Sequence, residues 1–427
     1  MKIKNLLLLL ALTCATASYA QRYMGGDISM YTKYKEAGSK YFDTGGTQIT
    51  NLYTYFKEQS MNMMRVRLFV DPTKATSDER SWGAIQDLDY VKKLGKEIKD
   101  NGLKLLLDFH YSDTWADPTN QWTPDSWKTM TDDQLIQQMY DYTKSVLQTM
   151  KDYGAEPDAI QIGNEISYGM LWGPVGTSSA NQKKAMSGSE SNWQRFADLL
   201  NNASAACREV CPSAKVVVHT EFIRNYNLLT NFYTQMSNYN VDYDIIGLSY
   251  YAPYHGTIPN QLRNALRWCK QNMSSKEVWI VEFAYPAQWA LPGTNTYESS
   301  LKTTYPYTDA GQAKFVSAAI AEMLTWDNVT GLFWWWPEAN EYGKATQITS
   351  SWWNGTLFNN QNGRAFSAIT HLKEFNPTTT GIDQVENTAA TDRTVSAEVY
   401  TIDGRKAEGN NLQKGIYIKN GKKYVVK

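Results

Sequence analysis

The chain contains little cysteine and little histidine, with four of each among 427 residues. Cys14 lies close to the N-terminus, which leaves Cys207, Cys211 and Cys269 for the rest of the chain. Three cysteines cannot form a complete disulfide framework. Cys207 and Cys211 could share one face of a helix, but no metal-ligand partners stand nearby and no H-E-x-x-H spacing occurs. We therefore expect buried free thiols, no metal and no cofactor.

An excess of charge is also missing, because 42 basic residues are balanced by 43 acidic residues. A nucleic-acid partner would favour a basic surface, so the balance argues against one. A polymeric substrate is expected to be neutral. The apolar run Leu6–Leu12 is too short to span a membrane. We expect no transmembrane segment in the mature chain, which we take to be a monomer.

Residues 1–20 have the pattern of a secretory signal peptide. Two lysines precede the apolar run, and Ser18-Tyr19-Ala20 offers a small-x-small cleavage site. Cys14 could instead mark a lipoprotein, but the residues before it match that signal poorly. We expect secretion, with the mature chain periplasmic or associated with the cell surface.

Aromatic residues are abundant: the chain has 15 tryptophans and 28 tyrosines. Aromatic faces stack on the C–H faces of sugar rings, and the indole N–H and phenol O–H can meet sugar hydroxyls. Most of these side chains are expected in the core. The functional interpretation depends on where particular tryptophans fall.

Short apolar runs alternate with helix-length amphipathic stretches, which indicates parallel βαβ units. Eight strands are predicted, at Met24–Ser29, Met63–Val70, Lys104–Phe109, Ala159–Glu165, Lys215–Thr220, Ile245–Tyr251, Glu277–Phe283 and Gly331–Pro337. The helices between them are predicted at Ile49–Gln59, Asp87–Asn101, Thr131–Tyr153, Ser191–Val210, Tyr226–Tyr239, Pro259–Asn272 and Ala310–Trp326. Eight units predict an α/β fold, a (β/α)8 TIM barrel. A doubly wound sheet is the competitor, but its glycine-rich phosphate turn is absent.

A barrel places its active residues where the strands end. Asn164 and Glu165 close the fourth predicted strand, and Glu282 closes the seventh. Hydrolysis of a glycosidic bond needs an acid for the leaving oxygen and a second carboxylate at the anomeric carbon. A single glutamate at the end of a strand is often a salt-bridge partner. Two glutamates at the C-terminal ends of the fourth and seventh strands of one barrel favour a catalytic pair. Arg65 and Arg67 share a strand face, and an arginine near Glu282 would keep it ionised.

Six stretches resemble family 53 glycoside hydrolases, the arabinogalactan endo-β-1,4-galactanases. They are Gly26–Ser29, Arg65–Pro72, Leu106–Pro118, Gln161–Ile166, Gly169–Trp172 and Ile246–Tyr251, of which the part from His110 to Pro118 is the most specific. The likeness runs in order from about residue 24 to 375. It implies a (β/α)8 barrel and cleavage of the β-1,4-galactan side chains of pectin with retention of configuration.

The same resemblance implies roles for single residues. Glu165 would be the acid/base, Glu282 the nucleophile, and Asn164, Arg67 and Trp335 would line the site of the cleaved bond. From their positions at strand ends or in the specific stretch, further substrate-binding candidates are Asp108, His110, Trp115, His219, Tyr250 and Tyr251. At the end of the last barrel strand the family usually reads aromatic-Trp-Glu-Pro. This chain instead has Trp334-Trp335-Trp336-Pro337, and Glu338 follows the proline. The resemblance therefore does not assign the sugar contacts at the end of this strand. The acidic calcium motif of some relatives is also absent.

The character of the chain changes near residue 378. A threonine-rich linker precedes short β segments, and the end resembles the sorting tails of type IX secretion. We expect three parts: a leader at 1–20, a catalytic domain at 21–376 and a linker with a small β-rich tail at 377–427. Two rival functions stay open: another glycosidase on the same barrel, such as a mannanase or xylanase, and a non-catalytic sugar-binding protein.

Overall fold

The computed structural model describes residues 21–186, 190–293, 295–343, 348–349 and 352–377, together with four short strands near the C-terminus. The chain divides into two compact units, 1–376 and 377–427. The expected leader at 1–20 lies outside the described residues. Within them, no helix is long and apolar enough to cross a membrane.

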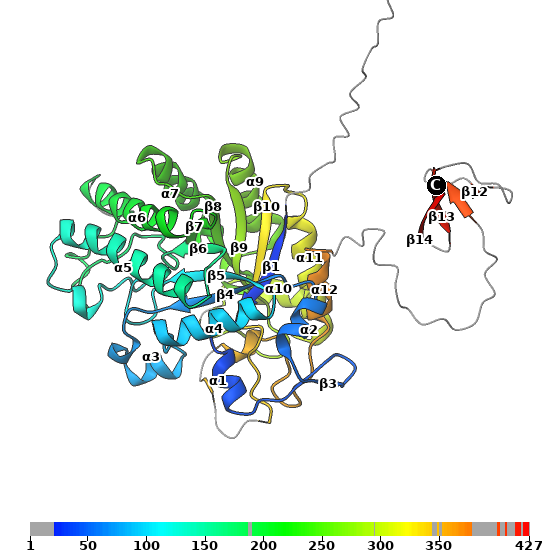
Figure 1. The fold of residues 1–427 in the computed structure, drawn as a ribbon. Helices are drawn as coiled ribbons and strands as arrows, with labels where there is room; N and C mark the ends of the chain where they lie inside the picture. The colour runs from blue at the N-terminus through cyan, green and yellow to red at the C-terminus, as the bar shows by residue number, and fades with distance from the viewer. Residues whose placement is uncertain are drawn as a thin grey trace, which may run out of the picture. The chain divides into compact units, whose positions relative to one another are not determined.

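Eight parallel strands close into a barrel in the order β1-β10-β9-β8-β7-β6-β5-β4 (Figure 1). This closed, parallel arrangement confirms the predicted TIM barrel and excludes the open doubly wound sheet. The strands are β1 (Tyr23–Asp27), β4 (Met63–Leu68), β5 (Lys104–Phe109), β6 (Ala159–Ile162), β7 (Lys215–Thr220), β8 (Ile245–Tyr251), β9 (Glu277–Ala284) and β10 (Val329–Trp335). A short hairpin, β2 (Tyr41–Phe42) with β3 (Gln48–Ile49), stands in the connection after β1.

Helices surround the barrel in Figure 1. The long ones are α4 (Leu88–Asp100), α5 (Asp132–Asp152), α6 (Glu190–Val210), α7 (Tyr226–Asn238), α9 (Arg263–Asn272) and α11 (Asp309–Met323). The shorter ones are α1 (Tyr31–Glu36), α2 (Leu52–Glu58), α3 (Ser77–Ser81), α8 (Ala252–His255), α10 (Glu298–Thr304) and α12 (Ala368–His371). Side-chain caps start several of them: Thr131 begins α5 in a capping box with Gln134, and Asp87 begins α4.

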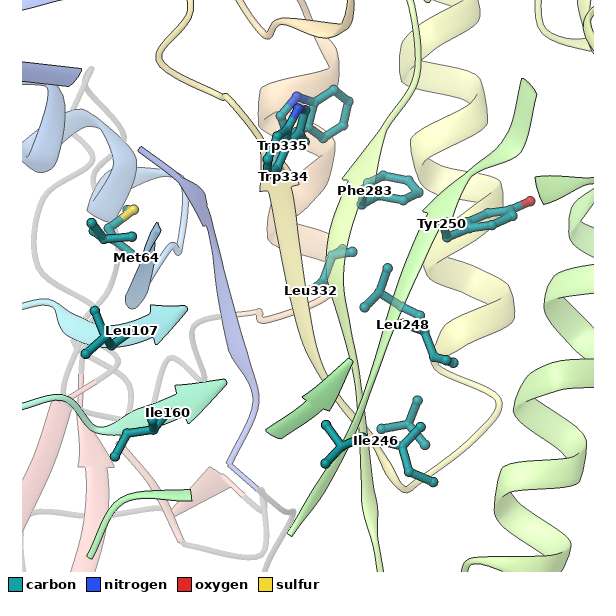
Figure 2. Close-up of a cluster of buried hydrophobic side chains, with 14 of the residues drawn as sticks. Met64, Leu107, Ile160, Ile246, Leu248, Tyr250, Phe283, Leu332, Trp334 and Trp335 are labelled. Carbon is teal, nitrogen blue, oxygen red and sulfur yellow. The ribbon is translucent and has the colours of Figure 1, made fainter. Parts of the chain in front are cut away.

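Two layers of apolar side chains hold the barrel together. Alternate residues of each strand point inward, where Met63, Leu106, Val217 and Phe333 belong to a small buried cluster. The other residues point outward against the helices. Figure 2 shows this outer layer along β8, where Ile246, Leu248 and Tyr250 follow one another at a spacing of two.

The second unit contains one antiparallel sheet in the order β12-β11-β13-β14. Its strands are β11 (Val399–Thr401), β12 (Lys406–Ala407), β13 (Gly415–Lys419) and β14 (Lys422–Val426). The pairs Asp403-Gly404 and Asn420-Gly421, whose residue types predict hairpin turns, lie outside the described residues. Cys207, Cys211 and Cys269 are buried free thiols, as expected.

Candidate active site

A cleft of about 280 Å³ lies where the barrel strands end, and both Glu165 and Glu282 line it. Glu165 belongs to the turn after β6, and Glu282 lies on β9. The rest of the lining is mainly aromatic and polar: Glu79, Trp82, Trp115, Ala116, Asp117, Asn120, Asn164, Tyr251, Trp335 and Trp352. The cleft thus combines two carboxylates with an aromatic wall.

A sharp turn, rather than the strand itself, presents Glu165. We expected the strand to continue to Glu165, but β6 ends at Ile162. Gly163 has a φ of 109° and Glu165 a φ of 44°, so the backbone reverses direction within three residues. A Cβ on Gly163 would lie 2.6 Å from Cγ2 of Ile166, so only glycine fits there. A non-glycine residue with positive φ is costly, and such strain is typical of functional sites.

A serine and a histidine orient the carboxyl group of Glu165. The hydroxyl of Ser249 donates to Oε1 of Glu165 at 2.5 Å. Since that hydroxyl has one proton, Nε2 of His219, 2.8 Å away, donates to Ser249. Nδ1 of His219 then accepts from the backbone N–H of Glu165 at 3.3 Å. Burial, aided by the charge of Arg65, lowers the pKa of His219 well below its usual value, so the ring is neutral in this network.

Arg65 gathers the acidic groups on the cleft floor. Its Nη2 lies 3.0 Å from Oε1 of Glu282 and 2.9 Å from Oδ2 of Asp108, and its Nη1 lies 2.9 Å from Oδ2 of Asp27. The hydroxyl of Tyr251 donates to Oε2 of Glu282 at 2.7 Å. The arginine that we expected near Glu282 is therefore Arg65.

The two glutamates have different electrostatic surroundings. Burial raises the pKa of Glu282 to about 7, although Arg65 and Tyr251 act in the opposite direction. Burial also raises the pKa of Glu165 well above its usual value, and the charges of Glu282 and Glu221 raise it further. The hydrogen bond from Ser249 opposes these effects, and no arginine pairs with Glu165 among the described residues. Of the pair, Glu165 thus holds its proton more tightly, and Glu282 ionises first.

Four of the expected substrate-binding residues line the cleft: Asn164, Trp115, Tyr251 and Trp335. The side-chain oxygen of Asn164 accepts from Arg65 at 2.9 Å, and its nitrogen donates to the carbonyl of Ala116 at 2.8 Å. The indole nitrogens of Trp115 and Trp335 have no hydrogen-bond partner within the described part of the chain. Both nitrogens are buried, so the rings rather than the indole N–H groups face the cleft.

Four other candidates, Arg67, Asp108, His110 and His219, are buried and do not line the cleft. Arg67 pairs with Asp27 at 2.6 Å and lies 4.8 Å from the ring centre of Trp335. Asp108 accepts from Gln161 at 2.6 Å, and Nδ1 of His110 accepts from the N–H of Ala116 at 3.1 Å. We had expected these four side chains to contact the sugar. They instead lie beneath the lining residues and hold them in place.

Tyr250 needs a clear correction. It is fully buried and faces the helices, because it alternates on β8 with Tyr251, which faces the cleft. Its ring lies beside Phe283, 6.2 Å between centres (Figure 2), and its hydroxyl donates to the carbonyl of Gly256 at 3.0 Å. Tyr250 is a core residue.

The end of β10 places three consecutive tryptophans differently. Trp334 faces outward and donates to the carbonyl of Gly355 at 2.9 Å. Trp335 lines the cleft. Trp336 follows the strand with a φ of 53° and stacks on Trp335 at 5.7 Å and 11°. Glu338, beyond the proline, is buried, and its Oε1 accepts from the N–H of Met30 at 3.0 Å.

Sequence reasoning missed several residues of the site. Ser249 carried a usable signal, because it shares a strand face with Tyr251 at a spacing of two. Trp82, just after α3, and Trp352, in the connection after β10, line the cleft from loops. No strand end marks these two positions, so the sequence pattern gave no reason to choose them.

Comparisons with known proteins agree with this geometry. The model of glycosyl hydrolase family 53 matches residues 23–372. A probable arabinogalactan endo-β-1,4-galactanase A of Neosartorya fischeri is 32% identical over 342 residues, which are 78% of this chain and 88% of that protein. The arabinogalactan endo-β-1,4-galactanase of Humicola insolens is 29% identical and is covered to 98%, against 82% of this chain.

Among solved structures, the GH53 catalytic domain of Ignisphaera aggregans superposes with a TM-score of 0.71 at 30% identity. The match covers 83% of this chain and 96% of that domain. The family model spans well over half of the sequence and includes both Glu165 and Glu282. The chain therefore belongs to glycosyl hydrolase family 53.

Proposed function

We propose that this protein is a retaining endo-β-1,4-galactanase that hydrolyses the β-1,4-galactan of pectic arabinogalactan. One observation carries the proposal: Glu165 and Glu282 line the same cleft, and only Glu282 of the two is paired with an arginine among the described residues. A retaining glycosidase needs one carboxyl group protonated and the other ionised. The names of the relatives supply the substrate class.

Glu282 is the nucleophile in this proposal. Its carboxylate is held by Arg65 at 3.0 Å and by the hydroxyl of Tyr251 at 2.7 Å. Both partners favour the ionised form, which is the form that attacks the anomeric carbon. They also fix the direction of the attacking oxygen.

Glu165 is the general acid and then the general base. It keeps its proton because it is partly removed from water and faces other carboxylates. It first protonates the leaving oxygen while Glu282 forms the glycosyl–enzyme bond. It then takes a proton from water, which attacks the anomeric carbon and releases the sugar with its configuration retained. This mechanism requires the two carboxyl groups to stand about 5–5.5 Å apart.

The aromatic wall supports a sugar polymer as the ligand. Trp82, Trp115, Trp335 and Trp352 all line the cleft. Their rings can stack on pyranose faces. The open cleft, lined on several sides, suits cleavage within a chain. A sugar-binding protein without activity would not need the carboxyl pair.

The test is product analysis on potato-type β-1,4-galactan, with β-mannan and β-xylan as competing substrates. We expect soluble galactooligosaccharides from galactan alone, with the β configuration at the new reducing end. Glu282→Gln should lower kcat by about 10⁴-fold or more while still binding galactooligosaccharides, because the nucleophile is lost and the cleft is not. Release of sugar from mannan or xylan, or substantial turnover by Glu282→Gln, would contradict the proposal.

Secretion belongs to the same proposal, since galactan lies outside the cell. The leader at 1–20 supports it, and so does the resemblance of the C-terminal tail to a sorting signal. Mass spectrometry of the exported protein should find Gln21 as its first residue.

A further inference from the structure

A second depression of about 790 Å³ lies on the barrel unit apart from the catalytic cleft. Its walls come from the loop after β9, the start of α11 and the segment that precedes α12. Its volume is within the range of about 300–1,000 Å³ that is usual for ligand sites. We propose that this depression binds a second stretch of the polysaccharide substrate, a neutral β-linked galactan chain; the inference rests on the proposed function and deepens it.

An exposed tryptophan forms one side of the depression. Only five large hydrophobic side chains are well exposed among the described residues, and two of them are tryptophans. Trp82 is 45% exposed and lines the catalytic cleft, whereas Trp289 is 41% exposed and lines the second depression. The exposed part of the Trp289 indole on this wall can contact the C–H face of a sugar.

Polar groups suited to hydroxyls surround this indole. Oδ1 of Asn359 accepts from the N–H of Gln361 at 2.8 Å, and Oδ1 of Asn362 accepts from the N–H of Arg364 at 3.0 Å. These bonds fix both amides and leave their NH₂ groups for a ligand.

The lining carries one positive and one negative side chain, and both are already engaged. Arg364 donates to the carbonyl of Thr44 at 2.6 Å. Asp309 accepts from the N–H of Ser367 at 2.7 Å and from its hydroxyl at 2.6 Å. The balanced charge favours a neutral ligand over a phosphate or a metal ion.

The walls are held in place before any ligand binds. The backbone N–H of Phe42 donates to Gly363 at 2.9 Å, and the N–H of Ala365 donates back to Phe42 at 2.8 Å. These bonds tie the segment before α12 to β2. A preformed wall loses little conformational freedom on binding.

One loop separates the two cavities. It follows β9, which carries Glu282, and it reaches Trp289 seven residues later. Asn354 donates to the carbonyl of Ala290 in this loop at 2.6 Å, and Trp352, two residues before Asn354, lines the catalytic cleft. A long chain held at the depression would raise the local concentration of polymer at the cleft.

Affinity electrophoresis in gels that contain galactan, mannan or xylan tests the proposal. Glu282→Gln serves as the parent protein so that the polymer survives. In galactan, Trp289→Ala in this parent should lose at least about fivefold in affinity, the usual effect of removing an aromatic anchor. Trp289→Phe should retain most of the affinity. The matched control is Tyr153→Ala, which removes an aromatic side chain that is 40% exposed and lines neither cavity.

In the active enzyme, the rate on polymer relative to that on a short galactooligosaccharide should fall for Trp289→Ala and not for Tyr153→Ala. Equal retardation of Trp289→Ala and the parent in galactan would overturn the inference, as would retardation by mannan or xylan alone. Failure of the wild type to hydrolyse galactan would refute the proposed function instead. A Trp289-dependent retardation by galactan would then still support the second site.

Discussion

Arg65 is the positive charge that pairs with the carboxylates beneath the cleft. Its guanidinium meets Asp27, Asp108 and Glu282 within 3.0 Å, and it is fully buried. Three carboxylates share it, so the arrangement is stable only while the arginine is present. The same contact lowers the pKa of Glu282 against the effect of burial. Arg65 therefore links folding to the ionisation of Glu282, the proposed nucleophile.

Arg65→Met should lower the free energy of unfolding by about 3–5 kcal/mol, because buried carboxylates lose their partner. The pKa of Glu282 should rise, and since Glu282 must be ionised to attack, the acidic limb of the kcat/KM profile should move to higher pH. Urea unfolding and a pH–rate profile measure these effects. Arg65→Lys serves for the profile if the methionine variant does not fold.

A control substitution tests whether the loss of stability in Arg65→Met is specific to Arg65 or follows from removing any basic residue. Lys96 pairs with Asp100 at 2.7 Å on the surface of α4. Lys96→Met should change stability by no more than about 1 kcal/mol, because exposed pairs contribute little. Equal effects of the two substitutions would refute the role given to Arg65.

Ser249 is the second residue that sets the chemistry, through its hydrogen bond to Glu165. This bond lowers the pKa of Glu165 against burial. In Ser249→Ala the pKa of Glu165 should rise. Because Glu165 acts first as an acid and is needed protonated, the alkaline limb of the kcat/KM profile should then move to higher pH.

The same substitution should lower kcat by about tenfold or more, the rate equivalent of a hydrogen bond to a charged group. Ser249→Thr keeps a hydroxyl and should restore much of the rate and the original profile. A purely structural role of Ser249 would lower thermal stability without moving the alkaline limb.

At the scale of the element, the turn after β6 decides where the carboxyl group of Glu165, the proposed acid/base, points. Gly163 and Glu165 both adopt positive φ, and the N–H of Ile166 donates to the carbonyl of His219 at 3.0 Å. The turn is thereby tied to the end of β7. A backbone held in this way keeps Glu165 in a strained conformation that it would not adopt alone.

Gly163→Ala should therefore damage both stability and activity. The added methyl group would meet Ile166 at 2.6 Å, and a non-glycine residue at positive φ costs about 1–2 kcal/mol in addition. We expect a lower Tm and a clear loss of kcat/KM as Glu165 shifts.

Gly176→Ala is the matched control for that substitution. Its φ is 87°, but no atom lies within 4 Å of the added Cβ. It should show the backbone cost of about 1–2 kcal/mol alone and leave kcat/KM unchanged. A similar loss of activity in both variants would show that contact with Ile166 does not position Glu165.

At the scale of the whole molecule, every residue of the cleft belongs to the first compact unit, 1–376. The family match also ends within it, at residue 372. A chain that stops after Asn376 should keep its Tm within a few degrees and its kcat/KM on galactan. Thermal unfolding and initial rates test this. A large loss of either property would mean that the tail supports the barrel.

The sequence alone was enough to predict the barrel and to group Glu165 with Glu282 at one end of it. Strand length and alternation depend on local pattern, so β5, β7 and β8 begin and end where the pattern predicts. Parallel strands place all their C-terminal ends on one face, which is why Glu165 and Glu282 could be grouped across more than one hundred residues. The family resemblance then gave each glutamate its role.

Only the tertiary structure decided which candidate side chains meet the cleft. Adjacent residues of a strand face opposite ways, so Tyr250 packs against the helices while Tyr251 contacts Glu282. Depth within the barrel likewise puts His110 and His219 below the floor. Trp82 and Trp352 reach the cleft from loops, whose course depends on long-range packing that no local periodicity encodes. Local pattern determined the scaffold and its catalytic end, and packing decided which side chains a sugar can touch.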